Sequence, residues 1–67
     1  MQMMRTNHDR IIYMGYENQT MRLQFDDGSL YEYYDVPQSV FAQFQASPTK
    51  DSFLSQYIRG HYAYKRL

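Results

Sequence analysis

The sequence of 67 residues has no cysteine, only three glycines and two prolines, and a formal net charge of zero. Without cysteine it has neither a disulfide framework nor a thiolate metal site, which fits a reducing, cytoplasmic environment. Zero net charge argues against a strong non-specific binder of polyanions. No stretch approaches the roughly 20 apolar residues of a membrane-spanning helix, and the first residues do not resemble a secretory signal. We therefore expect a soluble, cytoplasmic monomer without membrane contact.

Catalytic signatures are missing as well. No serine lies in a Gly-x-Ser-x-Gly turn, and no glycine-rich loop is available to hold a phosphate. His8, Asp9 and His61 lack the spacing of a zinc site. A chain of this length also has little volume for a substrate pocket. We expect no enzymatic activity, no cofactor and no metal, which leaves a small binding module as the expected class.

Aromatic side chains, by contrast, are plentiful: eight tyrosines and four phenylalanines make up 18% of the chain. A domain this small hides only about 60% of the surface that its unfolded chain exposes, so its stability margin is thin. Each aromatic ring buries roughly 150–250 Å². The rings are therefore expected to supply much of the core.

The first half of the chain predicts three antiparallel strands. Residues 11–16 are rich in β-branched and aromatic side chains, which is typical of a strand. Residues 21–26 alternate apolar and polar side chains, which indicates a second strand with one buried face. Asp26-Asp27-Gly28 predicts a hairpin turn, and residues 29–35 form the third strand.

The face that this third strand buries depends on the turn. A two-residue loop places Leu30 and Tyr34 on the core face, whereas a three-residue loop with a bulge at Gly28 places Tyr31 and Tyr33 there. A slip of one residue exchanges the two faces. The Asp-Asp-Gly sequence favours the bulged form, because it suits a type I turn closed by a left-handed glycine.

The second half predicts two helices. Pro37 suits a first helical position, and Ser47-Pro48 ends the first helix. The second helix starts near Thr49 or Asp51, either of which can cap it, and stops at Gly60. The side chains expected between helices and sheet are Phe41, Phe44, Phe53 and Ile58.

The predicted fold class is α+β: a three-stranded antiparallel meander followed by two short helices packed on one face, in the order β-β-β-α-α. Residues 1–7 are expected to be a disordered N-terminus, and residues 8–67 a single domain. The last residues, 61–67, are expected to run on as an irregular or extended tail.

Three groups of residues form a pattern along the chain. They are Met14-Gly15-Tyr16-Glu17, the series Leu23, Phe25, Gly28, Tyr31, Tyr33, Val36 and Pro37, and the series Phe53, Leu54, Ile58, Arg59, Tyr62 and Tyr64. In this order and spacing they resemble the signatures of the KTSC domain family. The resemblance covers about residues 8–66. This family occurs at the C-terminus of some lysyl-tRNA synthetases and in small stand-alone bacterial proteins, so the resemblance implies a role near RNA.

The chain departs from the family pattern at two polar positions. His8-Asp9 stands where the family often has a Ser-Ser pair, and Ser55 stands where it often has asparagine. The resemblance therefore gives no basis for assigning a role of those family residues to His8, Asp9 or Ser55.

Basic and aromatic residues interleave near the C-terminus. Such a pattern is typical of nucleic-acid binding, because cations contact phosphates while rings stack on bases. We hypothesise weak, salt-sensitive RNA binding. The candidate residues are Arg59, Tyr62, Tyr64, Lys65 and Arg66, with Tyr31 and Tyr33 as stacking partners.

Structural roles compete with this hypothesis. Tyr31 and Tyr33 also suit a core, Tyr62 and Tyr64 also suit a strap packed onto the domain, and Arg59 also suits an ion pair with Asp35 or Glu32. The alternative function is a protein-interaction module that uses a sheet edge and exposed tyrosines.

Overall fold

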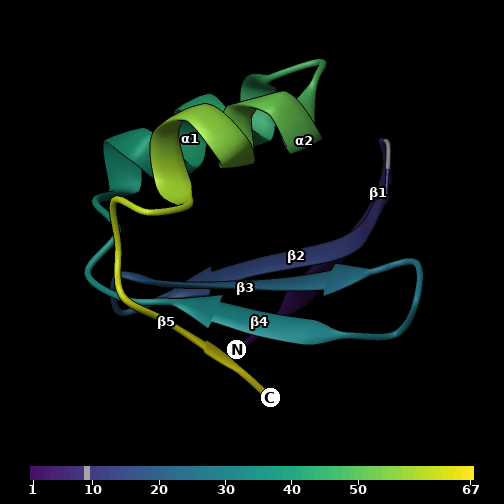
Figure 1. Cartoon of the computed structure of the whole chain (residues 1–67), viewed down its shortest axis with the longest axis horizontal. Coiled ribbons are helices and arrows are strands. Elements are labelled where there is room, and N and C mark those ends of the chain that lie inside the picture. The colour runs from purple at the N-terminus through teal and green to yellow at the C-terminus, as the bar shows by residue number, and fades with distance from the viewer. Residues whose placement is uncertain (9) are drawn as a thin grey trace.

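The computed structural model describes residues 1–8 and 10–67, with only the backbone of residues 7 and 8. In the described chain, one antiparallel sheet has the strand order β1-β2-β3-β4-β5. Both helices cover one side of this sheet and leave the other side uncovered (Figure 1). The elements are β1 (Met3–His8), β2 (Ile11–Glu17), β3 (Thr20–Phe25), β4 (Leu30–Tyr33), α1 (Gln38–Ala46), α2 (Lys50–Phe53), η1 (Leu54–Ile58) and β5 (Tyr64–Arg66).

The α+β class and the central meander β2-β3-β4 are confirmed, but the prediction of only three strands is wrong. One additional strand is β1, at residues 3–8, which pairs with β2 and places Met4 opposite Met14. The C-terminal tail also forms a strand. Its flanks are held to β4 by the Tyr34 N–H, which donates to the Ala63 carbonyl at 2.9 Å, and by the Leu67 N–H, which donates to the Leu30 carbonyl at 2.8 Å.

The β3–β4 turn has the predicted bulged form. The Gly28 N–H donates to the Phe25 carbonyl at 2.9 Å, and the Phe25 N–H donates to the Ser29 carbonyl at 3.0 Å. Gly28 has a φ of 88°, as a left-handed closing residue requires. The resulting register sets Tyr33 opposite Met21 and Tyr31 opposite Leu23. The prediction that Tyr31 and Tyr33 share the core face is therefore confirmed.

Gly28→Ala is expected to destabilise the domain by about 1–2 kcal/mol, since a left-handed backbone brings a Cβ too close to the following carbonyl. Beyond Gly28 itself and its two chain neighbours, a Cβ at this position would meet no atom within 4 Å, so the cost is confined to the local backbone. Urea denaturation measures the loss. Gly28→Asn is the control, because asparagine tolerates this conformation and should recover part of the stability. Equal stability of the alanine variant and the parent would contradict this account of the turn.

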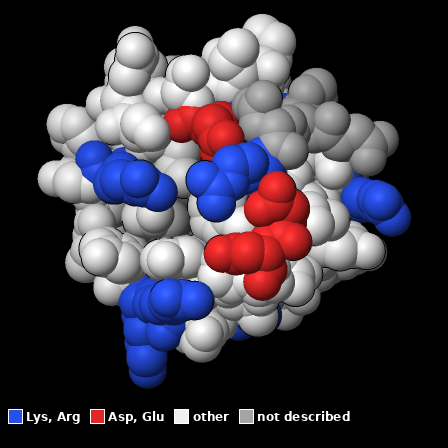
Figure 2. Space-filling model, turned by 45° about the vertical axis from the view of Figure 1, so that its right-hand side comes forward, with Lys and Arg blue, Asp and Glu red and all other residues white. Residues whose placement is uncertain are grey.

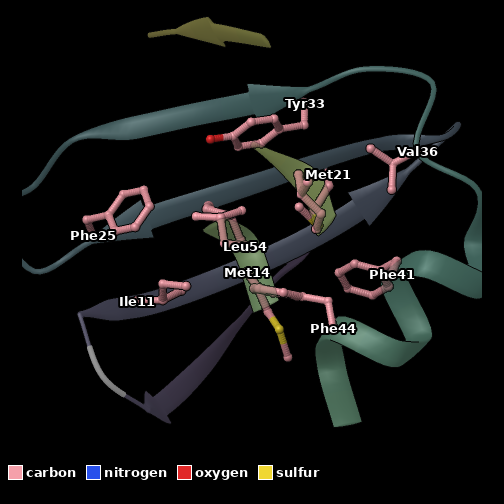
Figure 3. Packing of buried hydrophobic residues seen from close by; sticks show 11 residues of the cluster. Ile11, Met14, Met21, Phe25, Tyr33, Val36, Phe41, Phe44 and Leu54 are labelled. Carbon is pink, nitrogen blue, oxygen red and sulfur yellow. The ribbon is translucent and has the colours of Figure 1, made fainter. Parts of the chain in front are cut away.

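The core lies between the sheet and the helices (Figure 3). Phe41, Phe44 and Ile58 are buried there as predicted. The prediction for Phe53 is only partly right, because this ring is half-buried at the rim, 6.0 Å from Phe44 and 4.8 Å from Tyr57 between centroids. The buried hydrophobic residues are Ile11, Met14, Met21, Leu23, Phe25, Tyr33, Val36, Phe41, Phe44, Leu54 and Ile58.

The helices begin and end close to the predicted positions. Pro37 is the N-cap of α1 rather than its first residue, a difference of one position. The second helix starts as α2 and widens into the π-helical turn η1, in which the Arg59 N–H donates to the Leu54 carbonyl five residues earlier at 2.7 Å. Gly60, with a φ of 83°, ends it. No helix in the described part of the chain is both long and apolar enough to cross a membrane.

Candidate nucleic-acid interface

Three of the predicted tyrosines, Tyr31, Tyr33 and Tyr64, meet at the β4–β5 edge of the sheet. Strand pairing sets Tyr33 opposite Tyr64 and Tyr31 opposite Arg66. The Tyr64 ring lies 6.1 Å from the Tyr31 ring and 5.6 Å from the Tyr33 ring between centroids. The Arg66 Cζ lies 5.9 Å from the Tyr31 centroid, within the range of a cation–π contact. Two residues of the C-terminal tail are thus placed beside a tyrosine of the hairpin.

Arg59 reaches the same place from the end of η1. It lines a hollow of about 310 Å³ together with Tyr31, Tyr33 and Tyr64. Burial raises the pKa of the Tyr33 hydroxyl, and a hydrogen bond from Arg59 acts against that rise. We call Tyr31, Arg59, Tyr64 and Arg66 the aromatic-basic corner.

Arg59 does not form the expected pair with Glu32 in the described structure. Glu32 instead accepts a hydrogen bond from Arg22 Nε at 2.9 Å, across the β3–β4 pair. This hydrogen bond is the main reason that the pKa of Glu32 is lowered, and the Tyr34 hydroxyl adds to it at 3.0 Å. Arg22 therefore neutralises Glu32, and the Arg59 guanidinium lines the tyrosine hollow instead.

The two predicted stacking partners on β4 differ in exposure. Tyr33 is 2% exposed and belongs to the core, so it forms the floor of the hollow and offers no free ring. Tyr31 is half-buried and lies edge-on to Phe25, 5.5 Å between centroids. Tyr64 is 59% exposed. The rings able to meet a ligand at this place are therefore Tyr31 and Tyr64.

Tyr62 and Lys65 do not join this group. Tyr62 packs against the hydrophobic core, as the strap alternative predicted for it. Lys65 stands opposite Glu32, and successive residues of a strand point to opposite faces, so it lies on the uncovered side of the sheet. Of the predicted site residues, the structure brings together Tyr31, Arg59, Tyr64 and Arg66 above Tyr33.

The face of the molecule shown in Figure 2 carries both signs of charge. In Figure 2, Lys and Arg side chains stand at separate places around acidic side chains rather than in one continuous field. One such contact joins Arg10 Nε to Asp26 Oδ1 at 3.7 Å, and both side chains are exposed. A surface of this kind favours local contacts over long-range attraction of polyanions.

The structure also reveals a cleft that sequence reasoning missed. It measures about 270 Å³ and lies beside the hollow, with which it shares Tyr31 and Arg59. Its other lining residues are Arg10, Phe25, Asp27, Ser29, Asp51, Leu54 and Ser55. These residues come from separate elements, and no local spacing in the sequence connects them.

The histidines give no metal cluster in the part of the chain that is described. Within those residues no three His, Asp or Glu side chains are grouped to hold an ion. His61 is exposed on the segment after η1. The side chains of His8 and Asp9, which the sequence analysis considered, lie outside the described residues.

Comparison with known proteins gives the family. The model of the KTSC domain matches residues 9–62, which is more than half of the chain. The chain belongs to the KTSC domain family. A solved structure of a KTSC domain protein from Yersinia pestis superimposes with a TM-score of 0.90 at 26% identity, covering 98% of this chain and 96% of that one.

Curated relatives of this KTSC domain are much longer proteins. A lysine–tRNA ligase of a Nostoc species is 39% identical over 49 residues, which are 73% of this chain and 9% of the ligase. The lysine–tRNA ligase of Trichormus variabilis is 37% identical over 49 residues, with the same coverage. The chain therefore spans less than a tenth of the length of these ligases and matches a single segment of them.

Proposed function

We propose that this KTSC domain binds RNA weakly through the aromatic-basic corner. The observation that carries the proposal is the exposed Tyr64 ring beside Tyr31, with the Arg66 guanidinium over the same Tyr31 ring. Tyrosine rings hold unpaired bases by stacking, and guanidinium groups contact phosphates. Lysine–tRNA ligases, which contain a similar segment, are named for an RNA substrate, and this supports RNA as the ligand class.

A role as a protein-interaction module finds less support at the sheet edges. β5 is only three residues long, and β1 has a register shift between Arg5 and His8. Short and bulged edge strands resist the addition of a further strand. Recovery of one stoichiometric protein partner, unaffected by nuclease, would nevertheless favour that alternative over RNA.

Titration of the full chain with a single-stranded 15-nucleotide RNA at low salt tests the proposal. We expect the amide signals near residues 59–66 to shift and the affinity to fall as salt rises. If Arg59 and Arg66 each replace one counterion, the logarithm of the binding constant should fall with a slope of about −1.4 against the logarithm of salt concentration. Amide signals in this segment that stay unchanged at low salt would overturn the proposal.

Tyr64→Ala should weaken RNA binding by roughly fivefold to 100-fold, the usual loss when one ring–base stack is removed. Tyr57→Ala is a matched control, because Tyr57 is 57% exposed against 59% for Tyr64 but stands on η1 beside Phe53. Fluorescence anisotropy with labelled RNA measures both variants. Equal losses in the two would show that any exposed tyrosine contributes and that the corner has no special role.

A further inference from the structure

The tyrosine hollow and the neighbouring cleft adjoin each other on the surface. Tyr31 and Arg59 line both, so that one ring and one guanidinium group stand at the boundary. The hollow, closed by Tyr33 and Tyr64, is aromatic. The cleft, which holds Arg10, Ser29 and Ser55, is largely polar. A ligand that fills both parts must join a flat apolar group to a polar one.

The aromatic part suits a planar ring. Tyr31 and Tyr64 are tilted by 35° to each other, and Tyr64 is largely exposed. A nucleobase that lies against either ring gains stacking energy whichever of the bases it is, since every base has a π-face. The Arg59 guanidinium also lines this part, and it carries five N–H donors.

The polar part has nearly balanced charge. Arg10 and Arg59 are offset by Asp27 and Asp51, so the cleft does not attract anions through a net field. Asp27 Oδ1 already accepts hydrogen bonds from the Ser29 N–H at 2.9 Å and the Ser29 hydroxyl at 2.7 Å, which lower the pKa of its carboxyl. A phosphate would therefore be held by the forked donors of arginine rather than by bulk attraction.

From this juxtaposition we infer that the hollow and the cleft together hold one unstacked nucleotide of a bound strand, with its base against Tyr31 and Tyr64 and its phosphate at Arg59 and Arg10. The inference rests on the proposed RNA binding and adds its unit of recognition. The two parts contribute different contacts, because the stacking rings lie in the hollow, whereas the second arginine, Arg10, lies in the cleft. The domain should therefore bind a nucleoside monophosphate more tightly than the nucleoside or inorganic phosphate.

Titrations of the full chain with adenosine monophosphate, adenosine and inorganic phosphate, followed by amide chemical shifts, test this inference. We expect the monophosphate to shift the signals of residues 29–31 and 59 at concentrations where phosphate shifts none and adenosine shifts fewer. If phosphate and the monophosphate shift the same signals at the same concentrations, the inference is overturned, because the site then binds an anion without recognising the base. A monophosphate that moves none of these signals while the 15-nucleotide RNA still binds would overturn it and leave RNA binding standing.

The variant Arg10→Gln tests whether the cleft itself contacts the phosphate. It should weaken binding of the monophosphate by about threefold to tenfold, as one charge-assisted contact is lost, and leave adenosine binding unchanged. Arg5→Gln removes the same charge from β1, where Arg5 stands opposite Tyr13 and away from the cleft, and should change neither. Equal losses in the two variants would show that only net charge matters and would overturn the assignment of the cleft.

Discussion

Phe44→Ala is expected to remove most of the stability of the domain and to leave it largely unfolded at room temperature. Phe44 has no exposed surface and lies 6.4 Å from Phe41 and 6.0 Å from Phe53 between ring centroids. Removing such a ring costs about 3–5 kcal/mol, from lost transfer energy and the cavity left behind. A domain of this length has a total stability of roughly 3–10 kcal/mol, at 0.05–0.15 kcal/mol per residue.

The measurement is the free energy of unfolding from urea titrations followed by circular dichroism, with the parent and variant under the same conditions. Phe53→Ala is the matched control, because its ring is half-buried at the rim and should cost about 1–2 kcal/mol. If Phe44→Ala unfolds at nearly the same urea concentration as the parent, then the Phe44 ring of α1 is not packed in the core.

Lys50→Met is the second change with a large expected effect, a loss of about 1–3 kcal/mol. Lys50 is only 3% exposed, which is rare for a lysine. Its Nζ donates to the Gln45 carbonyl at 3.0 Å and to the Ser47 carbonyl at 2.9 Å, at the end of α1. The last carbonyls of a helix lack partners within it and favour a cation. The ammonium group therefore joins the end of α1 to the start of α2.

The sign of this effect comes from the balance of two terms. Methionine has a side chain of similar length to lysine but no charge. The removal of a buried charge would by itself stabilise the variant. The substitution also removes the donor from two carbonyls at a helix end, a loss that is larger when the lost bonds are charge-assisted. Lys65→Met is the control on an exposed lysine and should stay within about 0.5 kcal/mol of the parent. A Lys50→Met variant at least as stable as the parent in urea would contradict the role of this ammonium as a helix cap.

Local sequence signals were sufficient to predict the turn, the strand register and the helix limits in the middle of the chain. The Asp-Asp-Gly turn predicted the register that turns Tyr31 and Tyr33 toward the core, because a glycine in the left-handed region allows the bulge. Pro37, Ser47-Pro48 and Gly60 marked the limits of the helices, since each acts on the backbone within one turn. The resemblance to the KTSC family, which the comparisons confirm, rested on these same segments.

The candidate site was predictable only in part. The interleaving of basic and aromatic residues identified Arg59, Tyr64 and Arg66, but the sequence did not separate them from Tyr62 and Lys65. That separation follows from the pairing of β5 with β4, which alternates the side chains between the two faces. Arg10 lines the cleft from the turn residue just before β2, and no motif relates it to η1.

The sequence alone thus determined the elements whose causes are local: the alternating strand β3, the bulged turn, the two helices and their stops. The tertiary structure alone decided the edges and the contacts across elements. β1 and β5 exist because the neighbouring strands supply hydrogen-bond partners, although their own residues carry no strong strand pattern. Such outcomes depend on groups distant in sequence, and no local propensity encodes them.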